Sequence, residues 1–438
     1  MSVHYHLYQH ITYVANPVDT KYQSMNVRVP IQINGSDVDT TNAPILFSFS
    51  APGYKAAAVP AGNFSSDPAK RTPNTNNSLL ALAAGYVVVE SGCRGSDYQS
   101  DGTYYGKGPA AIVDLKAAVR YIRHNDEIMP GNAKWIISTG FSGAGALSAL
   151  LGASGNSHLY DAYFEEIGAA DEDDGIYASA DFCPITDLEH ADMAYEWEFK
   201  TSPFKGDLVN QELSQQLKNA FAEYQASLNL QDENCFGNIT ADNYGQFLVK
   251  TYLIPSANKY LRALTEVERS AYLANNTWIE WSDDSATFTF EDYAANVSRL
   301  EDVPAFDAFS LDSRANKLFG NETTNARHFT NYSLRQTCGC PNAEIDDDLK
   351  TVVNLMNPMY FISQDSCSGC ADYWWIRHGT NDTNTALPVI INLATILENK
   401  GKDVNVSLYW DAKHMANEDP EDFIAWIGEI TGYTTVFC

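Results

Sequence analysis

The segment 138–155, STGFSGAGALSALLGASG, contains a serine at which covalent chemistry could start. Residues 140–144 read Gly-Phe-Ser-Gly-Ala and match the nucleophile pattern Gly-x-Ser-x-Gly except at Ala144. That pattern is typical of a sharp turn between a strand and a helix, which exposes the serine hydroxyl and requires small neighbours. A glycine-rich helix start chosen for close packing would look similar. Ser142 is therefore a candidate nucleophile that needs support from elsewhere in the chain.

Two late loops carry residues that could activate this serine. A serine hydroxyl is a weak nucleophile until a histidine takes its proton and a carboxylate orients that histidine. Asp382 follows a predicted strand at 372–379, and His414 follows one at 403–411. The chain order serine, acid, histidine is the order that accompanies a strand–turn–helix nucleophile. We therefore predict a catalytic triad of Ser142, Asp382 and His414.

Each partner also has a simpler interpretation. Asp382 could cap the helix predicted to begin near residue 386, and His414 could be a surface residue. We interpret His378, at the end of its strand, as a core histidine with its hydrogen bonds satisfied. Asp411 and His190 are the alternative acid and base. The presence of all three residue types in the required order favours the triad over coincidence.

Backbone amides should complete the site. The N–H of Gly143, directly after the serine, would point at a developing oxyanion. A second donor is expected from the loop SAPGYK (50–55), which follows the predicted strand 43–50. Gly53 and Tyr54 are the candidates for that second donor.

Alternating strands and helices position these residues. Short apolar runs predict strands, and runs with helical spacing between them predict helices. The predicted strands are 25–33 (an edge strand), 43–50, 86–92, 133–140, 176–187, 372–379 and 403–411, and the predicted helices are 77–85, 108–125, 142–153, 386–401 and 419–432. Such alternation predicts an α/β fold, with a mostly parallel sheet and helices on both of its faces.

The middle of the chain breaks this alternation. Residues 191–345 are richer in Tyr, Asn, Asp and Glu, and helical patterns occur at 210–228 and 263–274. We predict a core formed by 1–190 and 346–438, interrupted by a mainly helical lid at 191–345.

Composition limits the partners. The 438 residues carry a net charge of −28, which disfavours binding to nucleic acid. No run of about 18 apolar residues is present, so a membrane span is not expected. The N-terminal residues lack a signal-peptide pattern. Ten Asn-x-Ser/Thr motifs nevertheless favour a secreted glycoprotein.

The cysteines and the acidic cluster lack the spacing of known metal sites. The eight cysteines, at 93, 183, 235, 338, 340, 367, 370 and 438, permit disulfides and do not prove them. CGC (338–340) and CSGC (367–370) could together bind zinc, but their spacing favours disulfides or free thiols. ADEDDG (170–175) lacks the spacing of a calcium loop and is interpreted as a solvated charge run. We expect no metal and no cofactor.

Several segments resemble one known family. They are PAAIVDLKAAVRYIRHN (109–125), GFSGAGALSALLGASGNS (140–157), CPITDLEHADMAYEW (183–197), IRHGTND (376–382) and YWDAKH (409–414). They are similar to the bacterial-type tannases and feruloyl esterases, α/β-hydrolases with a large inserted lid. The resemblance implies that the predicted triad cleaves a phenolic ester through an acyl-enzyme. The substrate would be a small phenolic ester, free or attached to plant cell-wall polysaccharide.

The departures from the family pattern concern the acyl group. The family binds galloyl hydroxyls with an acidic residue two positions after the triad aspartate, where this chain has Asn384. A family glutamate before LFG corresponds to Ala315. No lysine of this chain matches the family's lid lysine; the nearby positions are Arg299, Leu300 and Glu301. Loss of carboxylates removes strong acceptors for phenolic hydroxyls, which favours hydroxycinnamate over galloyl esters. Tyr195 and Trp197 are predicted to line the substrate pocket, although both could be ordinary lid core.

Other functions remain as alternatives. One is a tannase proper acting on galloyl esters, and another is a serine peptidase on the same fold. No repeat region precedes the core, which disfavours the peptidase. A non-catalytic binding module is disfavoured because such a module need not retain a nucleophile and a base.

Overall fold

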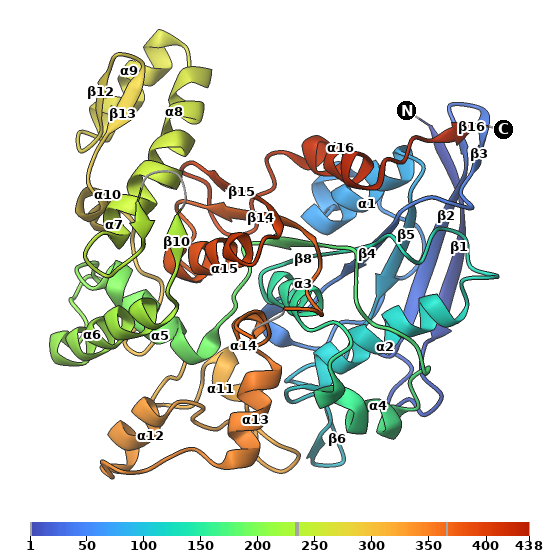
Figure 1. Ribbon diagram of the computed structural model, residues 1–438, viewed down its shortest axis with the longest axis horizontal. Helices are drawn as coiled ribbons and strands as arrows, with labels where there is room; N and C mark the ends of the chain where they lie inside the picture. The colour runs from blue at the N-terminus through green and yellow to red at the C-terminus, as the bar shows by residue number, and fades with distance from the viewer. Residues whose placement is uncertain (1, 233–235, 365–366, 438) are drawn as a thin grey trace.

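The computed structural model describes residues 2–232, 236–364 and 367–437. A ten-stranded sheet forms its centre. Its strands are β1 (Val3–Thr12), β2 (Ser24–Ile33), β3 (Ser36–Asp39), β4 (Ile45–Phe49), β5 (Val87–Ser91), β8 (Ile136–Phe141), β9 (Ala178–Phe182), β14 (Tyr373–Gly379), β15 (Asp403–Tyr409) and β16 (Val436–Phe437). The order across the sheet is β15-β14-β9-β8-β4-β5-β2-β3-β16, and β1 pairs with β2 (Figure 1).

The sheet is parallel from β5 to β15 and antiparallel at its N-terminal side. Strands β4, β5, β8 and β9 are buried along their whole length, as continuous apolar runs between two helical layers should be. The predicted edge position of 25–33 is wrong, because β2 lies between β1 and β5. Its alternating pattern was misleading: the polar Arg28 is buried in an ion pair with Glu90, 2.7 Å away.

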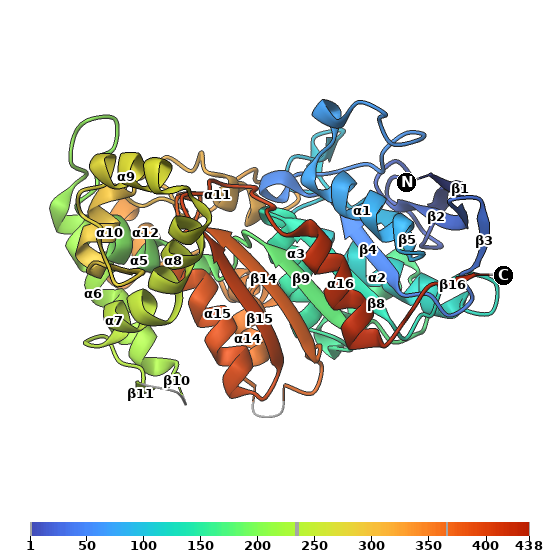
Figure 2. The ribbon, with the colours of Figure 1, turned by 90° about the horizontal axis from the view of Figure 1, so that it is seen from above.

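Helices cover both faces of the sheet, which confirms the predicted fold class. On one face lie α1 (Pro73–Ala83) and α16 (Pro420–Thr431). On the other lie α2 (Ala110–His124), α3 (Gly143–Ala153), α14 (Pro358–Ile362) and α15 (Leu387–Asn399), which Figure 2 shows from above, and α4 (Asp161–Ile167), which Figure 1 shows. The small hairpin β6 (Gln99–Ser100) and β7 (Thr103–Tyr104) projects from the core. None of the helices in the described part of the chain is long and apolar enough to cross a membrane.

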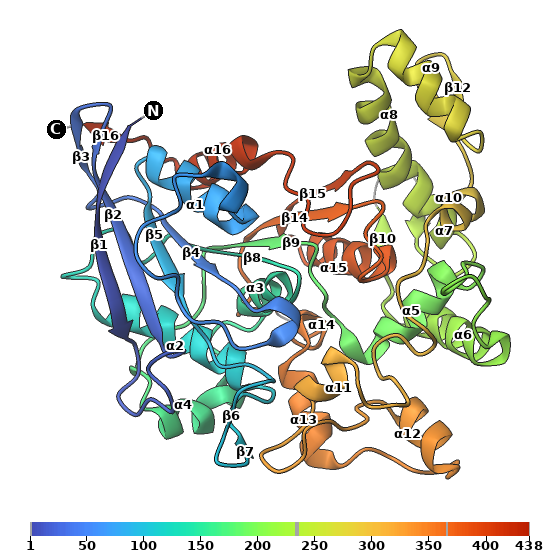
Figure 3. The same cartoon turned by 180° about the vertical axis from the view of Figure 1, so that it is seen from behind.

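The lid lies beside the β15 end of the sheet (Figure 3). It comprises α5 (Leu188–Phe199), α6 (Gln211–Ser227), α7 (Tyr244–Leu248), α8 (Ile254–Ala263), α9 (Glu266–Asn275), α10 (Phe290–Asn296), α11 (Arg314–Leu318) and α12 (Asn331–Cys338), followed by α13 (Asp347–Leu355). Two short hairpins interrupt these helices, β10 (Gln231–Asp232) with β11 (Gly237–Asn238), and β12 (Glu280–Ser282) with β13 (Ser285–Thr287). The predicted division at 190/191 falls inside α5, and the one at 345/346 falls just before α13.

The four cysteines considered as zinc ligands do not come together in the described part of the chain. Cys367 and Cys370 are joined by a disulfide, whereas Cys338 and Cys340 are exposed free thiols on the lid. Within 2–232, 236–364 and 367–437, no group of three or more metal-binding side chains includes any of these four. Of the other four cysteines, Cys93 and Cys183 are buried free thiols, and residues 235 and 438 lie outside the described residues.

The acidic run 170–175 is only partly solvated, which corrects the prediction. Asp174 is fully buried and forms ion pairs with Lys116 at 2.6 Å and Arg120 at 2.9 Å. Its carboxylate also accepts a hydrogen bond from the backbone N–H of Asn156. These cations come from α2, more than fifty residues earlier, so the local charge pattern could not show them.

Candidate active site

Ser142 stands at a sharp turn between β8 and α3. Its backbone has φ 61° and ψ −122°, a left-handed conformation that is costly for a residue with a side chain. Its N–H donates to Phe182 O on the neighbouring strand β9 at 3.0 Å. Its carbonyl accepts the first helical hydrogen bond from Ala146 N at 2.9 Å. The predicted strand–turn–helix is therefore present, and strain is concentrated at the candidate nucleophile.

Close approaches explain the irregular motif around this turn. A Cβ placed on Gly143 would lie 2.5 Å from Ala51 O, so this position accepts only glycine without rearrangement. A Cβ on Gly140 would lie 2.8 Å from the Ala144 methyl group. The methyl group of Ala144 therefore fits because Gly140 has no side chain. Alanine in place of the last motif glycine leaves the turn intact.

The structure brings Ser142, His414 and Asp382 into one hydrogen-bonded chain. His414 Nε2 lies 2.8 Å from Ser142 Oγ, and His414 Nδ1 lies 2.7 Å from Asp382 Oδ2. The other oxygen, Asp382 Oδ1, accepts from the N–H of Asn384 at 3.0 Å. Asp382 is buried and His414 is partly exposed, so the chain runs from the protein interior to the surface of a cavity.

Electrostatics favour a charged Asp382–His414 pair. Burial raises the pKa of Asp382, but His378, His414 and the N–H of Asn384 outweigh that effect and lower it. Burial lowers the pKa of His414, but the hydrogen bond to Asp382 and the nearby sulfur of Cys183 raise it to about 10. The site thus stabilises the imidazolium that forms when His414 takes a proton.

Two neighbours of the pair were not assigned to the site by the sequence. Cys183 follows β9, and its Sγ, a carboxylate oxygen of Asp382 and a ring nitrogen of His414 all lie within 4.8 Å of one another. The sequence held a signal for Cys183: it directly follows β9, whose carboxyl end meets that of β8, the strand before Ser142, at one edge of the sheet. His378 is buried in the core, as predicted. Its Nδ1 lies 3.6 Å from Asp382 Oδ2 and has no hydrogen bond, so the prediction that its hydrogen bonds are satisfied is wrong. Burial lowers the pKa of His378.

Of the predicted oxyanion donors, some have a backbone N–H that is free to bind an oxyanion and one does not. The loop residues Pro52–Tyr54 form one turn of 3-10 helix beside Gly143. The N–H of Tyr54 donates to Ala51 O at 3.0 Å, which corrects its assignment as an oxyanion donor. The N–H of Gly53 has no such partner among the described residues. Gly53 and Gly143 are therefore the pair of amides that could face a developing oxyanion.

Two cavities of about 610 Å³ each flank the turn. The first is lined by Ser142 and His414. The second is lined by Asn384 and Ala315, the positions at which the chain departs from the family pattern. Gly53 and Arg314 line both cavities and separate them.

The two aromatic residues predicted to line the pocket lie elsewhere. Tyr195 is fully buried, and its hydroxyl donates to Thr383 O at 3.1 Å while accepting from Leu300 N at 2.8 Å. The Tyr195 hydroxyl thus both donates to and accepts from backbone groups, and the buried side chain lies behind the cavity wall rather than in the cavity. Trp197 packs against Phe290 in an aromatic cluster and lines a separate lid cavity of about 920 Å³. Neither Tyr195 nor Trp197 lines the two cavities beside Ser142, so the predicted contact of these residues with the substrate is wrong.

The alternative acid and base are not part of the triad. His190 is hydrogen-bonded to Asp187 at 2.8 Å and stacks on Tyr224, near the start of α5. Asp411 accepts a hydrogen bond from Asn381 at 3.3 Å in the loop after β15. Both are therefore bonded to residues other than Ser142.

Comparisons with known proteins identify the family and the fold. Residues 60–227 match the family described as BD-FAE. Fusobacterium nucleatum tannase is 34% identical with a TM-score of 0.85, covering 98% of this chain and 95% of its own. Tannin acyl hydrolase from Lactobacillus plantarum is 33% identical with a TM-score of 0.85, covering 98% and 95%. A tannin acyl hydrolase in complex with ethyl gallate is 33% identical, with a TM-score of 0.85 and 98% and 94% covered. A comparison with curated protein sequences gave no match.

The chain belongs to the tannase family. Identity above 30% over nearly the whole length of both chains places it there. This confirms the resemblance seen in the core motifs, and it extends that resemblance across the lid. The protein is a tannase-like serine carboxylic ester hydrolase with the α/β-hydrolase fold.

Proposed function

We propose that Ser142, His414 and Asp382 are the catalytic triad of an esterase that hydrolyses phenolic acid esters. The continuous hydrogen-bonded chain from Ser142 Oγ through His414 to Asp382 supports this proposal. Gly53 and Gly143 supply the oxyanion donors. Membership of the tannase family supports a phenolic substrate, because relatives were solved with ethyl gallate and 3,4-dihydroxybenzoate.

The geometry suits a two-step reaction. His414 takes the Ser142 proton as Oγ attacks the ester carbonyl, and the oxyanion accepts hydrogen bonds from the two amides. The bond to the alcohol oxygen then breaks, and His414 gives its proton to the departing alcohol. A water, deprotonated by His414, attacks the acyl-enzyme and releases the phenolic acid and Ser142. Asp382 stays ionised and holds the imidazole in position throughout.

Covalent labelling tests the nucleophile. We expect a fluorophosphonate probe to label the wild type and the exposed-serine control Ser363→Ala, but not Ser142→Ala. We also expect Ser142→Ala to lower kcat by about 10⁴-fold or more, because the nucleophile is lost while binding remains. Labelling of Ser142→Ala at the wild-type rate would contradict the proposal.

For the acyl group we propose a hydroxycinnamate such as ferulate in preference to gallate. Asn384 and Ala315 line the second cavity, so two family positions for carboxylates present a neutral amide and a methyl group there. A galloyl ring would lose charged acceptors for its hydroxyls at these positions. The Asn-x-Ser/Thr motifs support a secreted enzyme, for which esters on plant cell-wall polysaccharide are accessible.

Galloyl ester hydrolysis is the second candidate, because one observation favours it. Glu301, Asp302 and Asp312 line the same second cavity and present other carboxylates to an acyl group. The solved relatives named above are also tannases.

Rates on matched esters decide between the candidates. We expect kcat/KM for methyl ferulate to exceed that for methyl gallate, with p-nitrophenyl acetate as a reference and a peptide amide as a test for peptidase activity. Asn384→Asp should raise the gallate-to-ferulate ratio by roughly tenfold, because it restores a charged acceptor. Asn381→Asp adds the same charge to the same loop and should leave that ratio unchanged. Wild-type preference for gallate would reject the hydroxycinnamate assignment.

A further inference from the structure

Arg314, the first residue of α11, lies where its side chain could contact a bound substrate. It lines both of the cavities that flank the nucleophile turn. Its side chain extends across Gly53, and a Cβ placed on that glycine would lie 3.1 Å from both Nε and Nη1 of the guanidinium. The cation therefore lies against the backbone of the residue whose N–H is a candidate oxyanion donor.

The Arg314 guanidinium has no fixed partner. It makes no hydrogen bond or ion pair with another residue of the described chain, and it is exposed. By contrast, the other arginines near the core have partners: Arg28 pairs with Glu90, and Arg299 pairs with Glu196. The donors of Arg314 are thus available to a ligand, and an arginine can bind a carboxylate through two parallel hydrogen bonds.

The cavity beside Ser142 contains one charged side chain that has no hydrogen bond or ion pair in the described chain. Its charged or titratable lining residues are Glu90, Arg314 and His414. Glu90 is neutralised by Arg28 at 2.7 Å, and His414 is bonded to Asp382. Arg314 is therefore the cation of this cavity that makes no hydrogen bond or ion pair in the described chain. Its charge also acts on Glu301 in the second cavity, where burial raises the pKa of that carboxyl and Arg314 opposes the rise. In a chain with a net charge of −28, it would offset the repulsion that an anionic substrate otherwise meets.

The two cavities suit different halves of an ester. The second cavity is lined by the carboxylates of Glu301, Asp302 and Asp312, which disfavour an anion there but can accept bonds from phenolic hydroxyls. This assigns the aromatic acyl group to the second cavity. The alcohol then occupies the cavity lined by His414, which must deliver a proton to it.

We propose that Arg314 binds a carboxylate on the alcohol half of the substrate, so that the enzyme prefers phenolic acid esters of hydroxycarboxylic acids. This inference rests on the proposed ester hydrolysis at Ser142. The carboxylate and the guanidinium would be desolvated together beside Gly53, which also orients the ester toward the oxyanion donors.

Two esters that differ only in charge test this specificity. Both carry the phenolic acyl group preferred in the methyl ester panel; one has 3-hydroxypropanoate as its alcohol and the other has 3-hydroxypropanamide. We expect a higher kcat/KM for the carboxylate ester in the wild type. Arg314→Gln should lower the carboxylate-to-amide ratio by about tenfold or more, and Arg314→Lys by less, because lysine keeps the charge but loses the planar pair of donors.

Lys205→Gln is the matched control, because it removes a positive charge from the second cavity only. It should retain the wild-type ratio. A wild-type ratio of one or below, a ratio unchanged in Arg314→Gln, or an equal fall in Lys205→Gln would each overturn the assignment. If the wild type does not hydrolyse the phenolic methyl ester at all, the proposed function fails; if it does and the ratio does not respond to Arg314, only the role of Arg314 fails.

Discussion

At the scale of single residues, the site is defined by what surrounds His414. The imidazole is hydrogen-bonded to Asp382 through Nδ1 and to Ser142 through Nε2, and the Cys183 sulfur lies close by; in the proposed mechanism the ring receives its proton from Ser142. Asp382 is itself bordered by His378, whose Nδ1 has no hydrogen bond. The balance of these groups decides at which pH His414 is free to act as a base.

A pH profile tests the part played by Cys183. His414 must be neutral to accept a proton, so kcat/KM should rise with pH through its pKa, which the site raises to about 10. Because the Cys183 thiol contributes to that increase, Cys183→Ala should move the rising limb to lower pH. The measurement is kcat/KM against pH, corrected for alkaline hydrolysis of the ester. Cys338→Ala, on the exposed lid, should keep the wild-type midpoint; identical midpoints in all three proteins would contradict the assignment.

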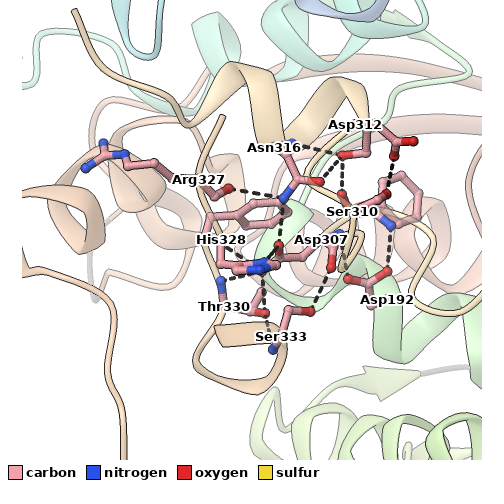
Figure 4. A network of polar contacts seen from close by, with 12 residues as sticks. Asp192, Asp307, Ser310, Asp312, Asn316, Arg327, His328, Thr330 and Ser333 are labelled. Carbon is pink, nitrogen blue, oxygen red and sulfur yellow. Dashed lines mark hydrogen bonds and ion pairs between the residues drawn. The ribbon is translucent and has the colours of Figure 1, made fainter. Parts of the chain in front are cut away.

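At the scale of elements, the core provides the nucleophile turn and the lid provides the cavity wall. A buried polar network fixes the lid segment that carries α11 (Figure 4). The Asp307 carboxylate is bonded to Asn316 Nδ2 and His328 Nδ1, each at 2.7 Å, and accepts from Thr330 N at 2.8 Å. Asp192 on α5 in turn accepts from Asp307 N at 2.9 Å. This network therefore sets the position from which α11 presents Arg314.

Removing the centre of the network should loosen the lid. Asp307→Ala leaves several buried donors without an acceptor, and we expect a loss of about 3 kcal/mol or more of stability. Thermal unfolding and limited proteolysis of the lid would measure it. Asp312→Ala is the control, because Asp312 is exposed and accepts its one hydrogen bond from Ser310. Equal effects of the two substitutions would show that the network does not hold the lid.

At the scale of the whole molecule, buried carboxyl groups and the net charge both lower the stability of the folded state as pH rises. Burial raises the pKa of Asp181 and Asp192 to about 7 and that of Glu198 to about 8. A carboxyl group with a raised folded-state pKa stabilises the fold fully below its unfolded pKa, and that contribution is lost as pH rises through the folded pKa. Mutual repulsion within a chain of net charge −28 grows over the same range.

We therefore expect the melting temperature to fall from about pH 5 to pH 8, opposite to the trend in activity. Added salt should reduce the fall by screening the repulsion. Glu198→Gln should flatten the fall above pH 7, because the amide does not titrate, whereas Glu266→Gln on the exposed surface should not. Melting curves at several pH values and two salt concentrations test this. A melting temperature that rises steadily to pH 8 would contradict it.

The sequence alone determined the alternation of the core and the order of the active-site candidates. Apolar runs of strand length separated by amphipathic runs were sufficient for β4, β5, β8, β9, β14 and β15. Burial on both faces leaves this local signature in all of them except β15, which lies at the edge of the sheet and is partly exposed. Ser142, Asp382 and His414 could be selected because the carboxyl ends of parallel strands meet at one edge of the sheet. The amphipathic patterns at 210–228 and 263–274 likewise predicted lid helices, observed as α6 and α9.

Only the tertiary structure decided how groups from distant segments meet. The burial of Asp174 depends on cations of α2, and the extension of Arg314 across Gly53 joins the lid to a core loop. Tyr195 was an aromatic residue at a plausible position, but its hydroxyl is taken by backbone groups more than a hundred residues away. Such contacts depend on how chain segments pack against each other, which leaves no periodic pattern in the local sequence. The candidate nucleophile could thus be selected from its motif and from the order of its partners along the chain, whereas the charges and cavities around it required the folded chain.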